Sequence, residues 1–289
     1  MAHAQIAIFA RLAKGGDAPQ RVIFGQATKL NRNMHAIRYG RRRDEIYVTN
    51  QFAQAILTFR GGANGQEPPL RVIQGPKTLL NNPGTLEIDE VNNEILVPQP
   101  ASENVLVFPL TANGDVAPLR ILRAGRKNGW TPARPAGGIA VDPVHNVLVI
   151  VGTVLTDEKI WQTPHGGNNR ESLLIFDRLA SGDARPLRVI RGPNTGMHTI
   201  RQIEIQPQGG WIVISQMTAG EIAEPEGTFV GVWSIHDQGD VPPRWKIEGK
   251  PGNGMKKPHG IALDPKHKEV VVADMRLNAI LTFYFPEIF

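Results

Sequence analysis

The chain has 289 residues, of which 41% are hydrophobic and 20% are charged, a composition typical of a soluble globular protein with a sizeable core. No apolar run approaches the roughly 18 residues of a membrane-spanning helix, so we expect no membrane insertion. Cysteine is absent, which excludes disulfides, thiolate metal sites and cysteine nucleophiles. The net charge is +5, and the basic cluster GRRRDE (40–45) is not interleaved with aromatic residues, so we expect a solvated turn there and no nucleic-acid partner.

Six short apolar strings recur along the chain, and each ends in an aromatic residue. They are QIAIF (5–9), AILTF (55–59), NVLVF (104–108), SLLIF (172–176), FVGVW (229–233) and a second AILTF (279–283). The closing aromatic residues are 50, 49, 68, 57 and 50 residues apart. A period near 50 residues indicates a repeat architecture.

Three further strings recur within each period. A turn leads to Pro-x-Arg and a strand, a loop rich in Gly, Asn and Pro leads to a second strand, and a third strand rich in β-branched residues follows. The first kind lies at 16–23, 66–73, 114–122, 182–190 and 239–247, and the second at 35–40, 84–89, 137–142, 201–206 and 259–264. Together with the aromatic-ended string, each period predicts four short antiparallel strands, the pattern of a β-propeller blade.

We therefore predict an all-β fold, a β-propeller with four-stranded antiparallel blades, as a single domain over 1–289. The second kind of string forms the innermost strand, and its five copies predict five blades, with six as the alternative. The chain begins and ends in mid-blade, so we expect N- and C-terminal strands to close the ring. One strand is surplus, because 5–9 and 279–285 both claim the third place in the closing blade.

Two phrases resemble NHL-type propeller repeats, KPHGIALDPKHKEVVVAD (257–274) and PAGGIAVDPVHNVLVIV (135–151). The resemblance extends over the whole chain and implies a propeller, commonly of six blades, without specifying a function. The Pro-His-Gly string at 258–260 is also similar to the strand starts that carry zinc-binding histidines in the propeller of peptidyl-hydroxyglycine lyases. That similarity implies a metal ligand at His259 and, by position, at His35.

The residue that opens each inner strand is expected at the mouth of the central pore. These residues are His35, Gly84, Gly137, Arg201 and His259. In one hypothesis His35, His259 and Asp274 hold a divalent metal, zinc or calcium, while Glu204 and Arg201 are catalytic, with Arg201 orienting a carboxylate. In the other, the polar residues meet ordered water, and Arg38 forms an ion pair with Glu87 or Glu204. No cofactor is certain from the residues alone.

Long loops are expected on the rim that carries the pore mouth. They are 125–136, 153–171 and 217–228, and long insertions on one face of a repeat fold usually mark the binding face. We therefore predict ligand contacts there from Trp130, Trp161, His165, Met217 and Glu224. The polar residues that end the third kind of strand, Asn50 and Gln216 among them, are predicted to line the same site.

The remaining repeated residues are expected to serve the blades themselves. The Pro-x-Arg arginines (Arg21, Arg71, Arg120 and Arg188) recur once per blade and are predicted to have a structural role in it, such as bonding a neighbouring carbonyl. Asp89, Asp142 and Asp264 end inner strands and are predicted to form turns.

The leading hypothesis for function is a propeller that binds a protein or small-molecule ligand through its long-loop face. The alternative is a metal-assisted hydrolase or lyase at the pore mouth. A homo-oligomer formed by exchange of terminal strands is a third option. No signal peptide is present as written, and an extracytoplasmic location follows only if Met1 replaces a cleaved leader.

Overall fold

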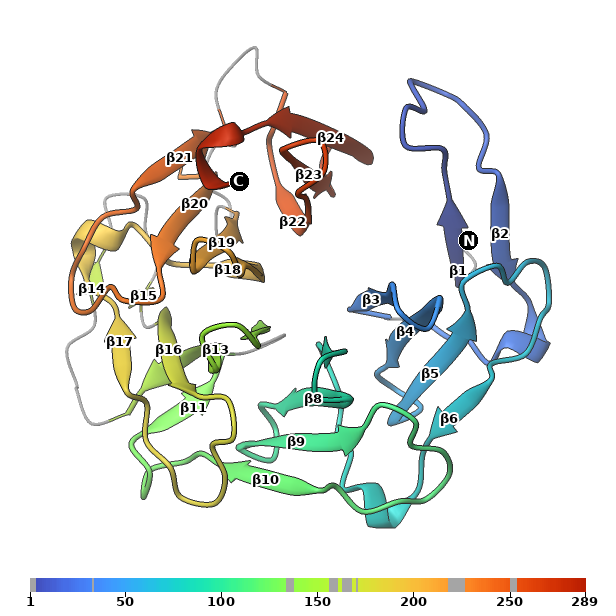
Figure 1. The fold of residues 1–289 in the computed structure, drawn as a ribbon, viewed down its shortest axis with the longest axis horizontal. Helices are drawn as coiled ribbons and strands as arrows, with labels where there is room; N and C mark the ends of the chain where they lie inside the picture. The colour runs from blue at the N-terminus through green and yellow to red at the C-terminus, as the bar shows by residue number, and fades with distance from the viewer. Residues whose placement is uncertain are drawn as a thin grey trace. The chain divides into compact units, whose positions relative to one another are not determined.

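The structure is a computed structural model that describes residues 4–32, 34–133, 138–155, 161–162, 168–169, 171–217, 227–249 and 254–289. It is all-β, and its antiparallel sheets form five propeller blades, as the sequence predicts (Figure 1). The helices among the described residues are single 3₁₀ turns, η1 (Gln26–Thr28), η2 (Pro76–Thr78), η3 (Pro193–Thr195) and η4 (Pro286–Ile288). None of them is long and apolar enough to cross a membrane.

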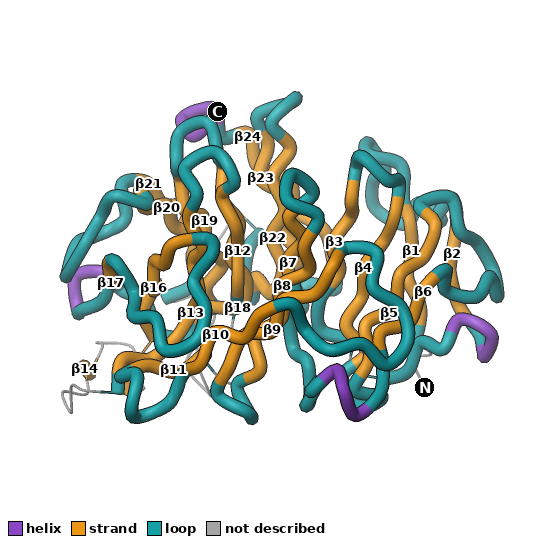
Figure 2. Tube along the Cα trace, turned by 60° about the horizontal axis from the view of Figure 1, so that its bottom comes forward, coloured by secondary structure: helices purple, strands orange, loops and turns teal. Residues whose placement is uncertain are grey.

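The chain folds as two compact units. Unit 1 comprises 1–102 and 106–121, and unit 2 comprises 103–105 and 122–289. The single domain predicted over 1–289 stays a prediction. Successive strands of each blade are joined by turns at alternate ends of the sheet (Figure 2).

The first two blades have the predicted four strands. They are β3 (Ile37–Gly40), β4 (Glu45–Asn50), β5 (Ala55–Arg60) and β6 (Arg71–Ile73), then β7 (Glu87–Asp89), β8 (Glu94–Gln99), β9 (Asn104–Pro109) and β10 (Arg120–Arg123). The strands β1 (Gln5–Ile8) and β2 (Arg21–Phe24) form a two-stranded sheet. Within unit 1, the inner strands β3 and β7 lie against each other.

Unit 2 carries the other three blades. The third contains β12 (Ile139–Asp142), β13 (Val147–Val154), β16 (Glu171–Asp177) and β17 (Arg188–Ile190), and the fourth contains β18 (Ile200–Gln206), β19 (Trp211–Gln216), β20 (Phe229–Ser234) and β21 (Trp245–Glu248). The fifth has three strands, β22 (Pro258–Asp264), β23 (Glu269–Asp274) and β24 (Ala279–Tyr284). The inner strand β18 contacts both β12 and β22.

Two strand pairs were not predicted. The strand β11 (Trp130–Pro132) adds to β13 beyond the end of β12, so the third sheet has five strands. The strands β14 (Trp161–Gln162) and β15 (Asn168–Asn169) pair within the segment predicted as one long loop. These additions all belong to the third blade, whose insertions are the longest.

The turn between the first two strands of every blade ends in a left-handed residue. The residues at this position are Asp44, Asn93, Asn146, Gly210 and Lys268, with φ between 52° and 62°. A turn between two antiparallel strands that matches their twist needs positive φ, which Gly, Asn and Asp adopt most easily. Four of the five positions hold one of these residue types, and Lys268 is the exception.

Neighbouring blades are linked by a repeated backbone bridge. The last strand of one sheet pairs with a glycine that follows the third strand of the next blade, as in Ile23 with Gly65 and Ile73 with Gly114 in unit 1, and Ile190 with Gly239 in unit 2. The glycine turns after the third strands therefore connect neighbouring sheets.

The Pro-x-Arg arginines have the predicted structural role. Arg21 donates to the carbonyls of Gly61 and Ala63 at 2.9 Å, and Arg188 donates to a carbonyl of the next blade in the same way. Arg71 instead pairs with Glu45, with Nη2 2.6 Å from Oε2, and Arg120 pairs with Glu94. In both of those blades the carboxylate opens the second strand of the arginine's own sheet.

The surplus strand is assigned by the pairing. β24 takes the third place in its blade, because it pairs with β23 from Glu269–Tyr284 to Asp274–Ala279. β1 pairs with β2 instead, from Gln5–Phe24 to Ile8–Arg21. Closure of the blades by the terminal strands is not tested by these pairings and stays a prediction.

Candidate functional site

The candidate site lies on unit 2, where the inner strands β18 and β22 begin. The register of β18 on β19 shifts between Ile200 and Gln202, and that of β22 on β23 shifts between Pro258 and Gly260. The extra residue of the first bulge is Arg201, and that of the second is His259. A bulge interrupts the alternation of side chains between the two faces of a strand and changes the direction of one of them. The directions of the Arg201 and His259 side chains are therefore set by the same kind of local irregularity.

Arg201 and His259 are in direct contact. Nη2 of Arg201 lies 2.6 Å from Nε2 of His259, and both side chains are partly buried. A guanidinium has donors only, so Nε2 of His259 accepts the bond through its lone pair. The imidazole is therefore neutral here, with its proton on Nδ1.

Glu171 opens β16 and lies next to this pair. Its Oε2 accepts the backbone N–H of Ile200 at 2.5 Å. Burial raises the pKa of Glu171 to about 8, although the Ile200 hydrogen bond and the charge of Arg201 both oppose the shift. At neutral pH the carboxyl therefore holds its proton and leaves the charge of Arg201 uncompensated by Glu171.

Burial also disfavours the charged form of the Arg201 guanidinium. Burial lowers the pKa of Arg201, and the charge of Glu171 opposes that shift. The group stays a cation at neutral pH because arginine does not deprotonate in this range. Its buried Nε has no hydrogen-bond partner among the residues that the structure describes. A partly buried cation of this kind is stabilised by an anion at hydrogen-bond distance.

Gln202 holds the two inner strands together below the pair. Its Oε1 accepts the backbone N–H of Ile261 at 3.1 Å, and its Nε2 donates to Oε1 of Glu204 at 3.3 Å. A Cβ on Gly260 would lie 3.1 Å from Oε1 of Gln202, so the glycine of the Pro-His-Gly string allows this close approach. The predicted residue Glu204 is thus bound by Gln202, which follows Arg201 in β18.

No protein-family model matches this chain, and no curated protein matches it either. The resemblances to NHL repeats and to peptidyl-hydroxyglycine lyases therefore rest on the quoted strings alone.

The polar residues that end each second strand bind the loop that leads into their own blade. Nδ2 of Asn50 donates to the carbonyl of Lys29 at 2.7 Å, and Oε1 of Gln216 accepts from the backbone of His198 at 2.9 Å. Asp274 accepts four backbone N–H groups, those of Lys256, Lys257, Arg276 and Leu277. These atoms, which the sequence assigned to a ligand or a metal, are occupied by backbone groups.

The predicted long-loop contacts have mixed positions. Trp130 lies in β11 rather than in a loop, and only 1% of its surface is exposed, because its ring packs on Phe176 with centroids 4.9 Å apart. The prediction of a surface contact at Trp130 is therefore corrected: the ring belongs to the core. Met217 is partly buried and donates its N–H to the carbonyl of Thr199.

Three other predicted contacts are not placed. The described part of the structure does not include His165, Glu224, the side chain of Trp161 or the pore-mouth residue Gly137. His35 is a partly buried residue of unit 1, whereas His259 belongs to unit 2. A metal site that joins the two histidines stays a prediction.

Unit 1 confirms one structural alternative. Nε of Arg38 lies 3.0 Å from Oε2 of Glu87, and both side chains are largely buried. Burial raises the pKa of Glu87, while the charge of Arg38 opposes the shift. Arg38 thus pairs with Glu87, one of the two partners that the sequence allowed.

The basic turn at 40–45 is held by a hydrogen-bonded carboxylate, because Glu90 accepts the backbone N–H groups of Arg41 and Arg42.

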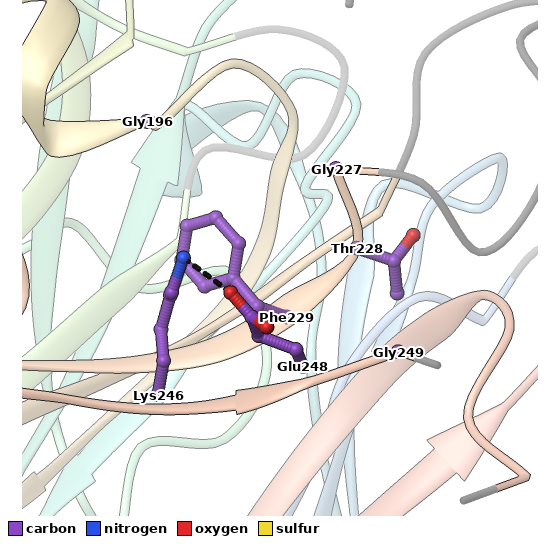
Figure 3. A pocket seen from close by; sticks show the side chains of 7 residues that line it. All are labelled: Gly196, Gly227, Thr228, Phe229, Lys246, Glu248 and Gly249. Atoms are coloured by element: carbon purple, nitrogen blue, oxygen red, sulfur yellow. Dashed lines mark ion pairs between the residues drawn. The ribbon is translucent and has the colours of Figure 1, made fainter. Parts of the chain in front are cut away.

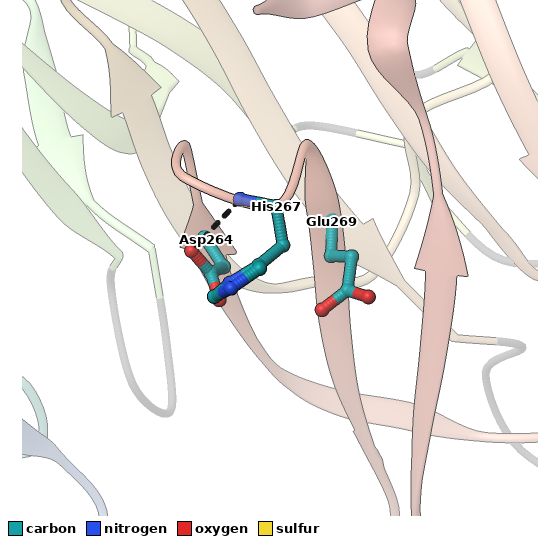
Figure 4. Close-up of side chains that lie close together, drawn as sticks. All are labelled: Asp264, His267 and Glu269. Atoms are coloured by element: carbon teal, nitrogen blue, oxygen red, sulfur yellow. Dashed lines mark hydrogen bonds and ion pairs between the residues drawn. The ribbon is translucent and has the colours of Figure 1, made fainter. Parts of the chain in front are cut away.

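Asp264, His267 and Glu269 form the one group of three potential metal ligands among the described residues (Figure 4). Nδ1 of His267 lies 2.6 Å from Oδ2 of Asp264, and this bond lowers the pKa of Asp264. The same Asp-Pro-x-His turn occurs at Asp142 and His145, with a distance of 2.7 Å. There the position of Glu269 is taken by a valine, so the Asp–His contact is a feature of the turn.

A pocket of about 300 Å³ opens beside the fourth blade (Figure 3). Its walls include Gly196, Gly227 and Phe229, and Nζ of Lys246 lies 2.7 Å from Oε1 of Glu248 at its edge. Nε2 of Gln216 donates to the carbonyls of Gly196 and Gly227 at 2.8 and 3.2 Å. Gln216, which the sequence predicted to contact a ligand, therefore binds two residues of the pocket wall.

Proposed function

We propose that the protein is a ligand-binding β-propeller and that Arg201 binds a carboxylate of its ligand. The observation that supports this most is the pairing of Arg201 with a neutral His259 on two equivalent bulges. The histidine fixes one edge of the guanidinium by accepting a hydrogen bond without neutralising its charge. The planar guanidinium retains donors that match the geometry of a carboxylate.

The long loops predicted on this rim would supply further contacts to the ligand. A binding protein needs a fixed polar anchor and variable surroundings, and loops on a rigid scaffold commonly supply the latter. The resemblance to NHL repeats accords with such a role, because that class of fold is a scaffold rather than one chemistry.

The alternative of a metal-assisted hydrolase or lyase requires a different hydrogen-bonding state of His259. Its Nε2 lone pair is used by Arg201, and a divalent cation beside this guanidinium would meet strong repulsion. Metal ligation through that nitrogen thus needs Arg201 to move away. We therefore favour binding of an anion over binding of a cation at this position.

The test uses acetate, succinate and citrate as probes. We expect at least one of them to raise the melting temperature, because a ligand at 100 times its Kd adds about 2.7 kcal/mol to the free energy of unfolding. Arg201→Gln should abolish the effect, and Arg201→Lys should weaken it. Arg244→Gln, which removes an exposed arginine of the fourth blade, is the control. The proposal fails if none of the probes acts, or if Arg201→Gln responds like the unchanged protein.

A further inference from the structure

The fourth blade departs from the repeat where its third and fourth strands pair. The pairs at this one register are Leu57–Val72 in the first blade, Leu174–Val189 in the third and Gly231–Lys246 in the fourth. A buried leucine and its apolar partner are thus replaced by a glycine and an ammonium group. In a protein whose repeats are otherwise consistent, a local departure of this kind is expected at a functional site.

Two aromatic rings close over Gly231. A Cβ atom there would lie 2.7 Å from Cε2 of Phe229 and 2.8 Å from Cζ3 of Trp233, so a side chain at this position would displace one of the rings. Nζ of Lys246 lies 5.2 Å from the centre of the Phe229 ring. The fourth blade therefore combines an aromatic ring and a cation where the first and third blades have aliphatic side chains.

This departure borders the pocket beside the fourth blade. Phe229, Lys246 and Glu248 line the pocket together with Thr228 and three glycines (Figure 3). All of these residues belong to unit 2. The volume of about 300 Å³ is at the small end of the range for ligand sites, so a small molecule is the expected occupant.

Among the described residues that line the pocket, the charged ones are Lys246 and Glu248. Nζ of Lys246 lies 2.7 Å from Oε1 of Glu248, and the two side chains are 39% and 40% exposed. An ammonium group has three donors and a carboxylate has several acceptor positions, so each group can bind a further partner while the pair stays intact. The pocket therefore presents both signs of charge side by side, next to an aromatic ring.

We propose that this pocket binds an α-amino acid with an apolar side chain. The carboxylate of the ligand binds Lys246, its ammonium group binds Glu248, and the four charges alternate in sign. The apolar side chain contacts the Phe229 ring and the glycine backbone. A simple anion would be repelled by Glu248 and a simple cation by Lys246, so a zwitterion is the class that suits both charges. The pocket is separate from the proposed carboxylate site, because Arg201 lies on the inner strand β18.

The experiment is isothermal titration calorimetry of the full chain with L-leucine and L-phenylalanine. We expect saturable binding of at least one of them. Leucinamide retains only the ammonium group of leucine, and 4-methylpentanoate retains only the carboxylate. Each of these two analogues should bind at least about tenfold more weakly than leucine, because each lacks one charge-assisted hydrogen bond.

Two substitutions assign the two charges. Lys246→Val restores the residue type of the first and third blades, and it should weaken binding of leucine about tenfold without weakening that of leucinamide. Glu248→Gln should weaken binding of leucine without weakening that of 4-methylpentanoate. Lys266→Gln, which removes an exposed lysine of the fifth blade, is the control. Melting temperatures show whether each variant folds.

Three outcomes overturn the proposal: neither amino acid binds, a single-charge analogue binds as tightly as leucine, or Lys246→Val binds leucine with unchanged affinity. Arg201→Gln distinguishes this pocket from the proposed carboxylate site, and it should leave binding of leucine unchanged. Loss of leucine binding in Arg201→Gln would place the amino acid at Arg201 and overturn the assignment to the pocket.

Discussion

Glu171 and Asp274 are both carboxylates removed from water, yet their pKa values move in opposite directions. Burial dominates at Glu171, where one backbone N–H is the only hydrogen bond to the carboxylate that opposes the shift. Burial also opposes ionisation of Asp274, but four backbone N–H groups together outweigh it and lower its pKa. The balance between the burial of a carboxylate and the donors that the backbone aims at it decides the direction of the pKa shift.

This difference predicts a pH-dependent stability that Glu171→Gln removes. The folded protein holds the proton of Glu171 up to about pH 8, whereas the unfolded chain releases it near the ordinary value of 4.5. The free energy of unfolding should therefore fall as the pH rises between these values. Glutamine is neutral at every pH and still accepts the N–H of Ile200.

The measurement is urea denaturation of both proteins from pH 4 to pH 9. Glu171→Gln should become more stable than the unchanged protein towards pH 8, and the difference should vanish near pH 4. Asp274→Asn tests the opposite pH dependence. Asp274 has a lowered pKa, and such a group contributes stability that is lost as the pH falls. Parallel pH profiles for Glu171→Gln and the unchanged protein would contradict the assignment.

Sequence reasoning identified some residues of the candidate site and missed others for a definite reason. Arg201 and His259 could be predicted because they occupy one repeated position, and their positions in the alignment of repeats brought them together. Glu171 and Gln202 are not repeated, and their contacts join residues 29 and 59 positions apart in the chain. Nothing in the local pattern signals such contacts.

At the scale of elements, the loops of this fold are held by side chains at strand ends. Gln216 is the clearest case, because it is fully buried and binds His198, Gly196 and Gly227 at once. Its equivalents Gln99 and Asp274 bind the backbone of the preceding loop in the same manner. In four of the five blades, one polar residue at the end of the second strand thus binds the loop that leads into the inner strand, and the third blade has Gly152 at that position.

We expect Gln216→Ala to destabilise the protein by about 2–3 kcal/mol, because it leaves buried backbone groups without partners. Gln208→Ala, an exposed glutamine in the same blade, should change the free energy of unfolding by less than about 0.5 kcal/mol. Chemical denaturation of the two variants provides the comparison. Equal stability of the two variants would show that the loop is held by other contacts.

The strands were predictable wherever the repeat signal was present. All five inner strands were found, since alternating apolar residues and turn residues recur with each period. The strands β11, β14 and β15 were not found, because they lie in insertions that only the third blade has. Trp130 is an example: no other blade has an equivalent residue, so the repeat pattern did not predict that it packs against Phe176.

At the scale of the whole molecule, a repeat fold makes each blade depend on strands from its neighbours in the chain. Four blades contain a third strand paired with a fourth, whereas β24 and the β1–β2 sheet each hold only part of a blade. The sequence predicted that these terminal parts close the fold together. If this prediction is correct, the outer edge of β24 is covered by a strand from the N-terminal part of the chain.

Hydrogen exchange tests this closure within one molecule, because the two copies of AILTF are an internal comparison. If the terminal strands complete the fifth blade, we expect the amides of 280 and 282 to be protected as strongly as those of 56 and 58, since a fourth strand would accept their outward N–H groups. Exchange at least about a hundredfold faster at 280 and 282 than at 56 and 58 would contradict closure, because outward N–H groups of an unpaired edge exchange readily with water.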